Sequence, residues 1–246
     1  MSGHSKWHTI KHKKGALDAK RGKMFTKIVK ELTVAARMGG GDPDMNPRLR
    51  TVILKAKAAN MPKDNMEKAI KKGTGDLDGV DYVELQYEAY APGGVGLIID
   101  TLTDNKNRTA ANVKSILTKG GGQLAAQGAV SYQFNRKGIL TYSSEDVDFD
   151  ALFDAALEAG AEDVSEDNGI IEVKTEPSDF ETVLETLQEG GFNQLEAELS
   201  MVPDTTVELD NDKTAKILAL IEKIEDDDDV QSVASNLSIP DDFDME

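Results

Sequence analysis

The sequence contains no cysteine among its 246 residues. A disulfide framework and a thiolate metal site are therefore excluded, and nothing in the composition indicates an oxidising compartment. The sequence also lacks an apolar run near the roughly 18 residues that would span a bilayer, and its first residues are polar and basic, unlike a signal peptide. We expect a cytoplasmic protein with no membrane partner.

The common catalytic motifs are absent as well. The glycine-rich segments 39–41, 93–96 and 120–122 match neither the Walker pattern nor the strand-to-helix GxGxxG fingerprint. GxSxG and HExxH do not occur, and no nucleophile and base form a convincing pair. The prediction is a protein that is not an enzyme and has no cofactor, no metal and no small-molecule substrate.

Charge is distributed unevenly along the chain, whose net charge is −17. Residues 1–75 hold 18 lysines and arginines against 6 acids, whereas residues 76–246 hold 10 against 39. Such an asymmetry indicates a nucleic-acid or membrane contact at the basic end. The alternative is charge that only keeps the protein soluble, but solubility does not require the signs to be sorted by domain.

The hydrophobic pattern predicts a basic arm over residues 1–15 and then three short helices. Apolar residues at steps of three and four indicate the first helix, from Ala16 to Met38. Asn46 and Pro47 are typical of the start of the second helix, and the third follows Pro62 and is expected to end at Gly73. Together they make a small bundle.

Downstream, the pattern predicts an α+β, multidomain fold with two α/β units. Residues 137–203 follow the order βαββαβ of a ferredoxin-like domain, with a turn at Asp167, Asn168 and Gly169 between its second and third strands. The helix and strand after it have no partner sheet of their own, so we expect them to return to the sheet that begins at residue 82. The predicted domains are 1–78, then 79–135 with 204–246, and an inserted ferredoxin-like domain over 136–203.

Several local features carry finer predictions. Ser178 with Glu181 is typical of a capping box. The segment 104–109 presents backbone amides and Arg108 to an anion, or is capped by Thr109 or Asn107. The run 226–229 is expected to be a solvated turn, or to compete with nucleic acid for the basic domain.

One row of lysines provides the main candidate site. Lys20, Lys23, Lys27 and Lys30 repeat at the spacing of the apolar stripe, and the two stripes lie roughly 140° apart, so the lysines are expected to face away from the core. Lysines in such a row can follow a phosphate backbone and release counterions. A solvated helix face is the alternative, although such faces usually mix signs.

The arm and the remaining cations complete the predicted nucleic-acid site. Trp7 lies among Lys6, Lys11, Lys13 and Lys14, so its ring either stacks on a base or anchors the arm to its own domain. His4, His8 and His12 have the spacing of a metal stripe but lack nearby carboxylates, and they are interpreted as further donors. The other predicted site residues are Arg21, Arg37, Arg48 and Arg50.

The sequence resembles the YebC family almost from end to end. The segments that carry the resemblance are GHSKW, IKHKK, DAKRGKMFTKI, GGGDPDMNPRLR, NMPKDNMEKAIKKG, YEAYAPGGVG, TDNKNRT and EAGAEDV. His8, Thr9 and the pair Gly15 and Ala16 depart from the family pattern, which leaves the lysines untouched. The resemblance implies a helical domain, two α/β units with the third domain inserted in the second, and a role in gene expression.

Three hypotheses follow for the function. The family resemblance implies DNA-binding transcriptional regulation for bacterial members and assistance to the translating ribosome for others, a mitochondrial relative being a translational activator of a cytochrome oxidase subunit. Phosphate contacts serve DNA and ribosomal RNA alike, so the lysines do not separate these two. The third hypothesis is an adaptor whose acidic domains bind basic proteins.

Overall fold

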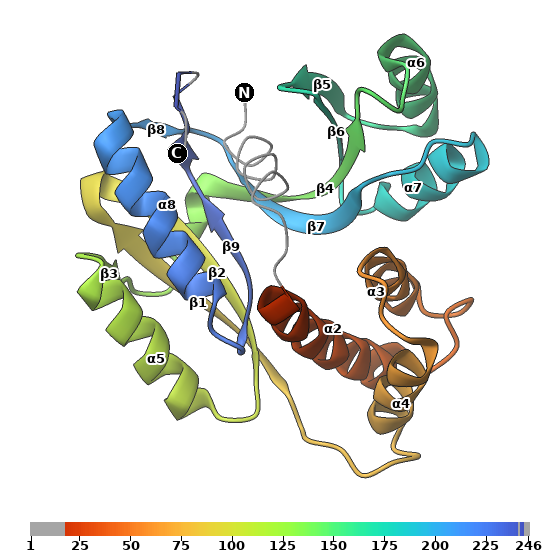
Figure 1. The fold of residues 1–246 in the computed structure, drawn as a ribbon, viewed down its shortest axis with the longest axis horizontal. Coiled ribbons are helices and arrows are strands. Elements are labelled where there is room, and N and C mark those ends of the chain that lie inside the picture. Colours follow the sequence, from red (N-terminus) through yellow and green to blue (C-terminus); the bar gives the residue numbers. More distant parts are fainter. Residues whose placement is uncertain (1–17, 241, 244–246) are drawn as a thin grey trace.

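The computed structural model describes residues 18–240, 242 and 243, with side chains from residue 22 onward. A helical N-terminal part is followed by two α/β units (Figure 1), so the predicted α+β class is confirmed. Among the described residues, no helix is both long and apolar enough to cross a lipid bilayer.

Three helices form the N-terminal bundle: α2 (Asp18–Gly39), α3 (Pro47–Ala58) and α4 (Lys63–Thr74). The predicted start of α3 is confirmed, because the Asn46 side chain accepts a hydrogen bond from the Leu49 amide at 3.1 Å and Pro47 is the first helical residue. The apolar stripes of the three helices meet in one core of buried side chains, among them Ile28, Leu32, Leu49, Ala56, Met66 and Ala69.

The sequence predicts that α4 ends at Gly73, and this prediction is wrong. The helix continues to Thr74 and ends at Gly75, whose φ of 87° is left-handed. Gly73 instead lies where α4 crosses α2, and a Cβ atom there would lie 2.3 Å from the carbonyl oxygen of Thr33. The missing side chain therefore allows close helix contact.

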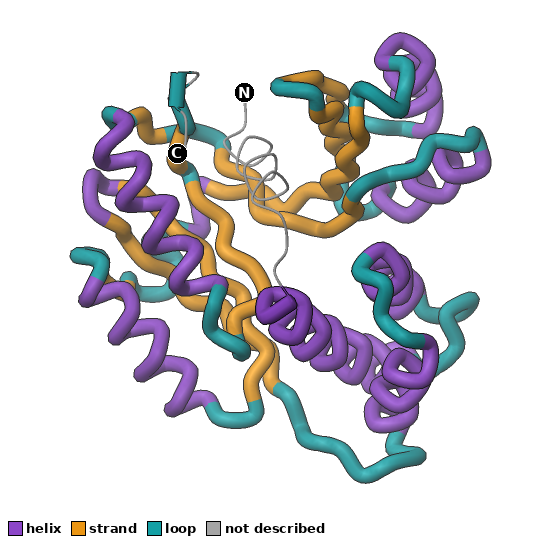
Figure 2. Tube along the Cα trace, in the orientation of Figure 1, coloured by secondary structure: helices purple, strands orange, loops and turns teal. Residues whose placement is uncertain are grey.

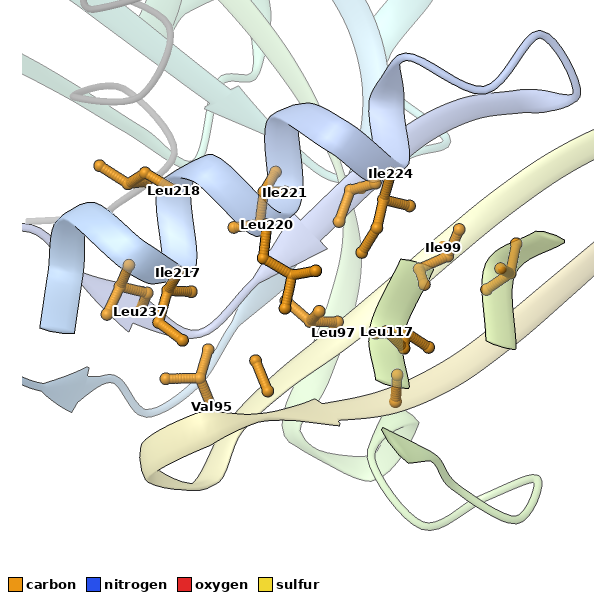
Figure 3. Close-up of a cluster of buried hydrophobic side chains, with 14 of the residues drawn as sticks. Val95, Leu97, Ile99, Leu117, Ile217, Leu218, Leu220, Ile221, Ile224 and Leu237 are labelled. Atoms are coloured by element: carbon orange, nitrogen blue, oxygen red, sulfur yellow. The ribbon is translucent and has the colours of Figure 1, made fainter. Parts of the chain in front are cut away.

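The first α/β unit has a sheet in the order β3-β1-β2-β9. Its strands are β1 (Val83–Ala91), β2 (Val95–Thr103), β3 (Gln123–Leu124) and β9 (Val230–Ser235), with the short helix η1 (Pro92–Gly94) between β1 and β2. Helices α5 (Lys106–Lys119) and α8 (Asn211–Glu225) cover one face and bury a large apolar cluster against it (Figures 1 and 3). Two short parallel strands, β8 (Val207–Glu208) and β10 (Leu237–Ser238), lie beside this sheet.

The chain returns to this sheet after a long excursion, since β9 pairs antiparallel with β2 and Ala234 lies opposite Ile98. The excursion is the second α/β unit, with sheet order β5-β6-β4-β7. After the short helix η2 (Ser131–Gln133), its elements are β4 (Phe134–Ser143), α6 (Phe149–Ala159), β5 (Asp163–Asp167), β6 (Ile170–Thr175), α7 (Phe180–Glu189) and β7 (Glu196–Pro203). The order βαββαβ and the insertion agree with the predicted fold class.

In Figure 2, the helices of the two α/β units lie on the outer sides, with the two sheets between them. The turn between β5 and β6 was predicted from its sequence, and its Asn168 and Gly169 have φ of 51° and 83°, as a tight hairpin requires. The ends of the inserted unit lie side by side, because Phe134 at the start of β4 pairs with Pro203 at the end of β7.

Two polar residues have partners that local patterns did not indicate. Asp179, not Ser178, is the N-cap of α7, and Glu181 accepts a hydrogen bond from Thr51 of α3 at 2.6 Å, so the predicted capping box is wrong. Glu88 alternates with apolar residues but is buried, and its carboxylate accepts hydrogen bonds from the amides of Gly128, Val130 and Ser131. Burial by itself would raise the pKa of Glu88, but these backbone hydrogen bonds outweigh that effect and hold the pKa below its usual value.

Candidate nucleic-acid interface

Part of the predicted site lies outside the described residues. This applies to Lys6, Trp7, Lys11, Lys13 and Lys14 of the arm and to the three histidines among them. Lys20 and Arg21 belong to α2, but their side chains are not described. The structure therefore places six of the predicted residues: Lys23, Lys27, Lys30, Arg37, Arg48 and Arg50.

The lysine row of α2 lies along one helix face, as its spacing predicts, but the end of α8 lies against that face and buries it progressively from Lys23 to Lys30. The Lys23 ammonium lies 3.2 Å from the Asp226 carboxylate and donates a hydrogen bond to the Asp226 carbonyl at 3.0 Å. The Lys27 ammonium donates to the carbonyl of Glu225, the last residue of α8. We call Asp226–Asp229, which follows α8, the acidic turn.

Lys30 is bound most tightly of the three. Its ammonium donates to the Asp229 carboxylate and to the Asp228 carbonyl, each at 2.7 Å, and to the Leu102 carbonyl at 3.3 Å. It also lies 5.6 Å from the centre of the Tyr82 ring. The expectation that the whole row faces solvent is wrong at Lys30, because its side chain is only 8% exposed.

Asp229 is the buried acceptor that holds this contact together. Besides Lys30, its carboxylate accepts hydrogen bonds from Thr109 at 2.9 Å and from Arg108 at 2.7 Å. Burial raises the pKa of Asp229, but the hydrogen bonds from Lys30, Arg108 and Thr109 outweigh it and lower the pKa to about 2. The prediction of a solvated turn is therefore wrong at Asp229, because the last residue of the acidic turn is a buried carboxylate.

The segment before α5 meets an anion that belongs to the chain itself. Arg108 was considered as an anion ligand, and the anions that it binds here are Asp104 and Asp229. The cap of α5 is Asn105, whose side chain accepts from the Arg108 amide at 3.1 Å, rather than Asn107 or Thr109. The side chain of Thr109 is buried and points to Asp229, so it is unavailable as a cap.

The three arginines of the bundle with described side chains also form ion pairs with residues outside the bundle. Arg37 lies 3.0 Å from Asp81. Arg48 forms an exposed pair with Glu84 of β1. Arg50 lies 3.1 Å from Glu185 and 3.5 Å from Glu181, both on α7 of the inserted unit. Arg48 and Arg50 thus join the bundle to the two α/β units, and Arg37 joins it to the linker before β1.

A second group of lysines, on α4, is in a different environment. Lys68, Lys71 and Lys72 follow the three-and-four spacing of one helix face, opposite Met66, Ala69 and Gly73, which are buried against the other helices. All three lysines are exposed, and no ion pair to them is found within the described part of the chain. We call these three residues the α4 lysine face.

The α4 lysine face is not among the site residues predicted from the sequence. Lys71 and Lys72 also lie in the last turn of α4, where cations are favourable for the helix itself. The same periodicity that singled out the α2 row also places Lys68 with them, and only their lack of covering elements distinguishes the two groups. That property depends on the packing of distant segments.

A shallow cavity of about 300 Å³ borders the α4 lysine face. It is lined by Lys72 together with Val29 and Thr33 of α2 and by the linker residues Asp78, Gly79, Val80 and Tyr82. An aromatic ring and a lysine thus share one surface depression, which is the combination that stacks a base and holds its phosphate.

Comparison with known proteins identifies the family of this chain. Residues 5–76 match the model of the TACO1/YebC protein N-terminal domain, and residues 82–237 match that of the TACO1/YebC second and third domain. The chain belongs to the TACO1/YebC family. The resemblance found in the sequence is therefore confirmed.

Relatives in the family are similar over their whole length. A protein of Treponema denticola, named a probable transcriptional regulatory protein, is 62% identical over 100% of this chain and 99% of its own. One of Geotalea uraniireducens with the same name is 55% identical, covering 97% and 96%. The crystal structure of a conserved hypothetical protein from Aquifex aeolicus is 43% identical, with a TM-score of 0.87 over 93% of this chain and 95% of that one. The Treponema denticola and Geotalea uraniireducens relatives are thus both named as probable transcriptional regulators.

Proposed function

We propose that this chain is a cytoplasmic, non-enzymatic regulator of gene expression that binds the phosphate backbone of nucleic acid. The observation that carries the proposal is the α4 lysine face, whose three exposed lysines have no described ion-pair partner. The names of the curated relatives support a regulatory role. From the sequence alone, the proposal also assigns phosphate or base contacts to Lys6, Trp7, Lys11, Lys13, Lys14, Lys20 and Arg21.

The α4 lysine face favours contacts to phosphates over contacts to bases. Lysine neutralises phosphates as a point charge, whereas guanine edges are most often recognised by a bidentate arginine. Arg37, Arg48 and Arg50 each form an ion pair within the chain. We therefore propose binding that depends strongly on salt and weakly on base sequence.

The test compares two variants with the same change in charge. One carries Lys68→Glu, Lys71→Glu and Lys72→Glu, and the control carries Lys114→Glu, Lys119→Glu and Lys216→Glu, three exposed lysines of α5 and α8. Fluorescence anisotropy with labelled duplex DNA should show about a tenfold or greater loss of affinity for the first variant and a salt dependence flatter by up to about three released counterions. Equal losses in both variants would contradict the proposal.

The ribosome-associated alternative is favoured by one specific observation, the cavity that contains Tyr82 and Lys72. Unstacked bases of folded RNA can lie on an aromatic ring, whereas the bases of duplex DNA are already stacked. Tyr82→Ala should then weaken binding to a ribosomal RNA fragment with loops about tenfold, while duplex DNA binding stays unchanged. Tyr82→Phe, which keeps the ring, is the control. An equal effect on both ligands would contradict this alternative.

A further inference from the structure

The contact between α2 and the end of α8 has the chemistry of a phosphate-backbone contact. Lys23, Lys27 and Lys30 donate in succession to the backbone carbonyls of Asp226, Glu225 and Asp228. Carbonyls at a helix C-terminus carry negative partial charge, and the carboxylates of Asp226 and Asp229 add full charges to the same row. The lysine row therefore already holds a line of anionic oxygens supplied by the chain itself.

The strength of this contact changes from one end to the other. At the Lys30 end, the side chains of Lys30 and Asp229 are 8% and 4% exposed. At the Lys23 end, the side chains of Lys23 and Asp226 are 45% and 57% exposed. An exposed ion pair is weak because water and salt screen it, whereas opening a buried pair leaves a charge without compensation. The contact can therefore open from the Lys23 end while Lys30 and Asp229 stay together.

We propose that the acidic turn is a built-in competitor for nucleic acid, and that Lys23 and Lys27 form a second phosphate-binding surface that the turn covers. Phosphates of a bound strand replace Asp226 and the neighbouring carbonyls at these two lysines, and the Lys30 to Asp229 pair acts as the fixed end. This inference rests on the proposed function, because it needs the α4 lysine face to bring the strand to the protein. The partner of the surface formed by Lys23 and Lys27 is a polymer of phosphates.

The test removes negative charge from the turn without touching its buried part. The variant Asp226→Asn with Asp228→Asn keeps Asp227, which accepts from the Asp229 amide at 2.9 Å, and keeps Asp229 itself. Its matched control is Asp150→Asn with Asp154→Asn, two exposed acids of α6. The turn variant should bind labelled duplex DNA about threefold more tightly than the control variant, the order expected when exposed ion pairs no longer compete.

The lysines themselves decide whether the gain is local. Adding Lys23→Gln and Lys27→Gln to the turn variant should abolish the gain, and the turn variant alone should steepen the salt dependence by up to about two counterions. A gain that survives the loss of both lysines would be a general charge effect and would overturn the inference. So would equal affinities of the turn variant and its control.

The outcomes also separate this inference from the proposed function. If the α4 variant loses binding while the turn variant behaves like its control, only the inference is wrong. If duplex DNA and ribosomal RNA both fail to bind the wild-type chain in dilute buffer, the proposed function and the inference are both wrong. Circular dichroism of each variant shows whether a change in affinity comes from lost structure.

Discussion

The α2 row and the α4 lysine face differ in their surroundings and not in their sequence pattern. Both place lysines at steps of three and four on a helix of the same bundle. The α2 row lies against the end of α8, whereas the three α4 lysines are exposed. Helical periodicity therefore identifies which residues share a face, and the rest of the fold decides whether that face meets solvent, a ligand or another part of the chain.

The largest difference between the two lysine groups should appear when Asp229, the buried acceptor of the α2 row, is removed. Asp229→Ala should lower the free energy of unfolding by about 3 to 5 kcal/mol, because it leaves the buried Lys30 ammonium without its counter-charge. Asp64→Ala, which removes an exposed acid of α4, should change it by less than about 0.5 kcal/mol. Urea denaturation followed by circular dichroism measures both. Equal effects would show that Lys30 and Asp229 are not a structural pair.

The support of the α4 lysine face can be broken at Gly73. Gly73→Ala puts a Cβ atom 2.3 Å from the Thr33 carbonyl, so the two helices must separate, at a cost of about 1 to 3 kcal/mol. Gly22→Ala on α2, where a Cβ meets nothing within 4 Å, is the control and should not destabilise the chain. Thermal unfolding measures both changes. A stable Gly73→Ala variant would mean that α2 and α4 do not cross so closely.

Acid should loosen the α2 contact and spare the α4 lysine face, which contains no acceptor carboxylate. The pKa of Asp229 is lowered to about 2 in the folded chain, below the roughly 3.9 of an unfolded aspartate. Its contribution is therefore nearly complete above about pH 5 and is lost as the pH falls through 2, a change of at most about 2.6 kcal/mol. Unfolding free energies of wild type and Asp229→Asn, measured across this range, should converge at the acid end. A constant difference would contradict the shift.

The smallest expected effect sharpens the comparison at the exposed end of the α2 row. Lys23→Ala removes an ion pair whose partners are 45% and 57% exposed, so it should cost no more than about 1 kcal/mol. Lys68→Ala removes no described pair and should cost nothing measurable. The Lys23 effect should also vanish in high salt, because screening removes the attraction. A loss that persists in high salt would point to packing of the lysine stem instead.

The sequence predicted the elements of this fold well and their contacts less well. The cap at Asn46, the turn at Asn168 and the return of β9 to β2 follow from local chemistry and from the need of each strand for a partner. Lys30 and Asp229 were both assigned to solvent, although they are buried against each other and lie 199 residues apart in the chain. A pattern within one segment contains no information about such a partner.

Glutamates show the same limit in a different form. Glu181 has the spacing of a capping residue and Glu88 has the alternation of a solvent-facing strand residue, yet each binds a segment remote from its own. The Gly73 position similarly depends on α2, which α4 crosses. Polar residues that join two units can be predicted as polar, but their partners become visible only when the units are placed together.

The pairing of Phe134 with Pro203 has a consequence for how the ferredoxin-like unit is attached. The chain leaves and re-enters the first α/β unit through two neighbouring strands, and the Asp204 amide donates to the Gln133 carbonyl at 2.8 Å just beyond them. The inserted unit is thus tethered by a double ribbon that resists twisting more than a single linker does. Because the two crossings are adjacent, a short hairpin turn could replace the whole insertion and leave β1, β2 and β9 paired. Such a replacement would still remove the ion pairs that Arg50 forms with Glu181 and Glu185 of the inserted unit.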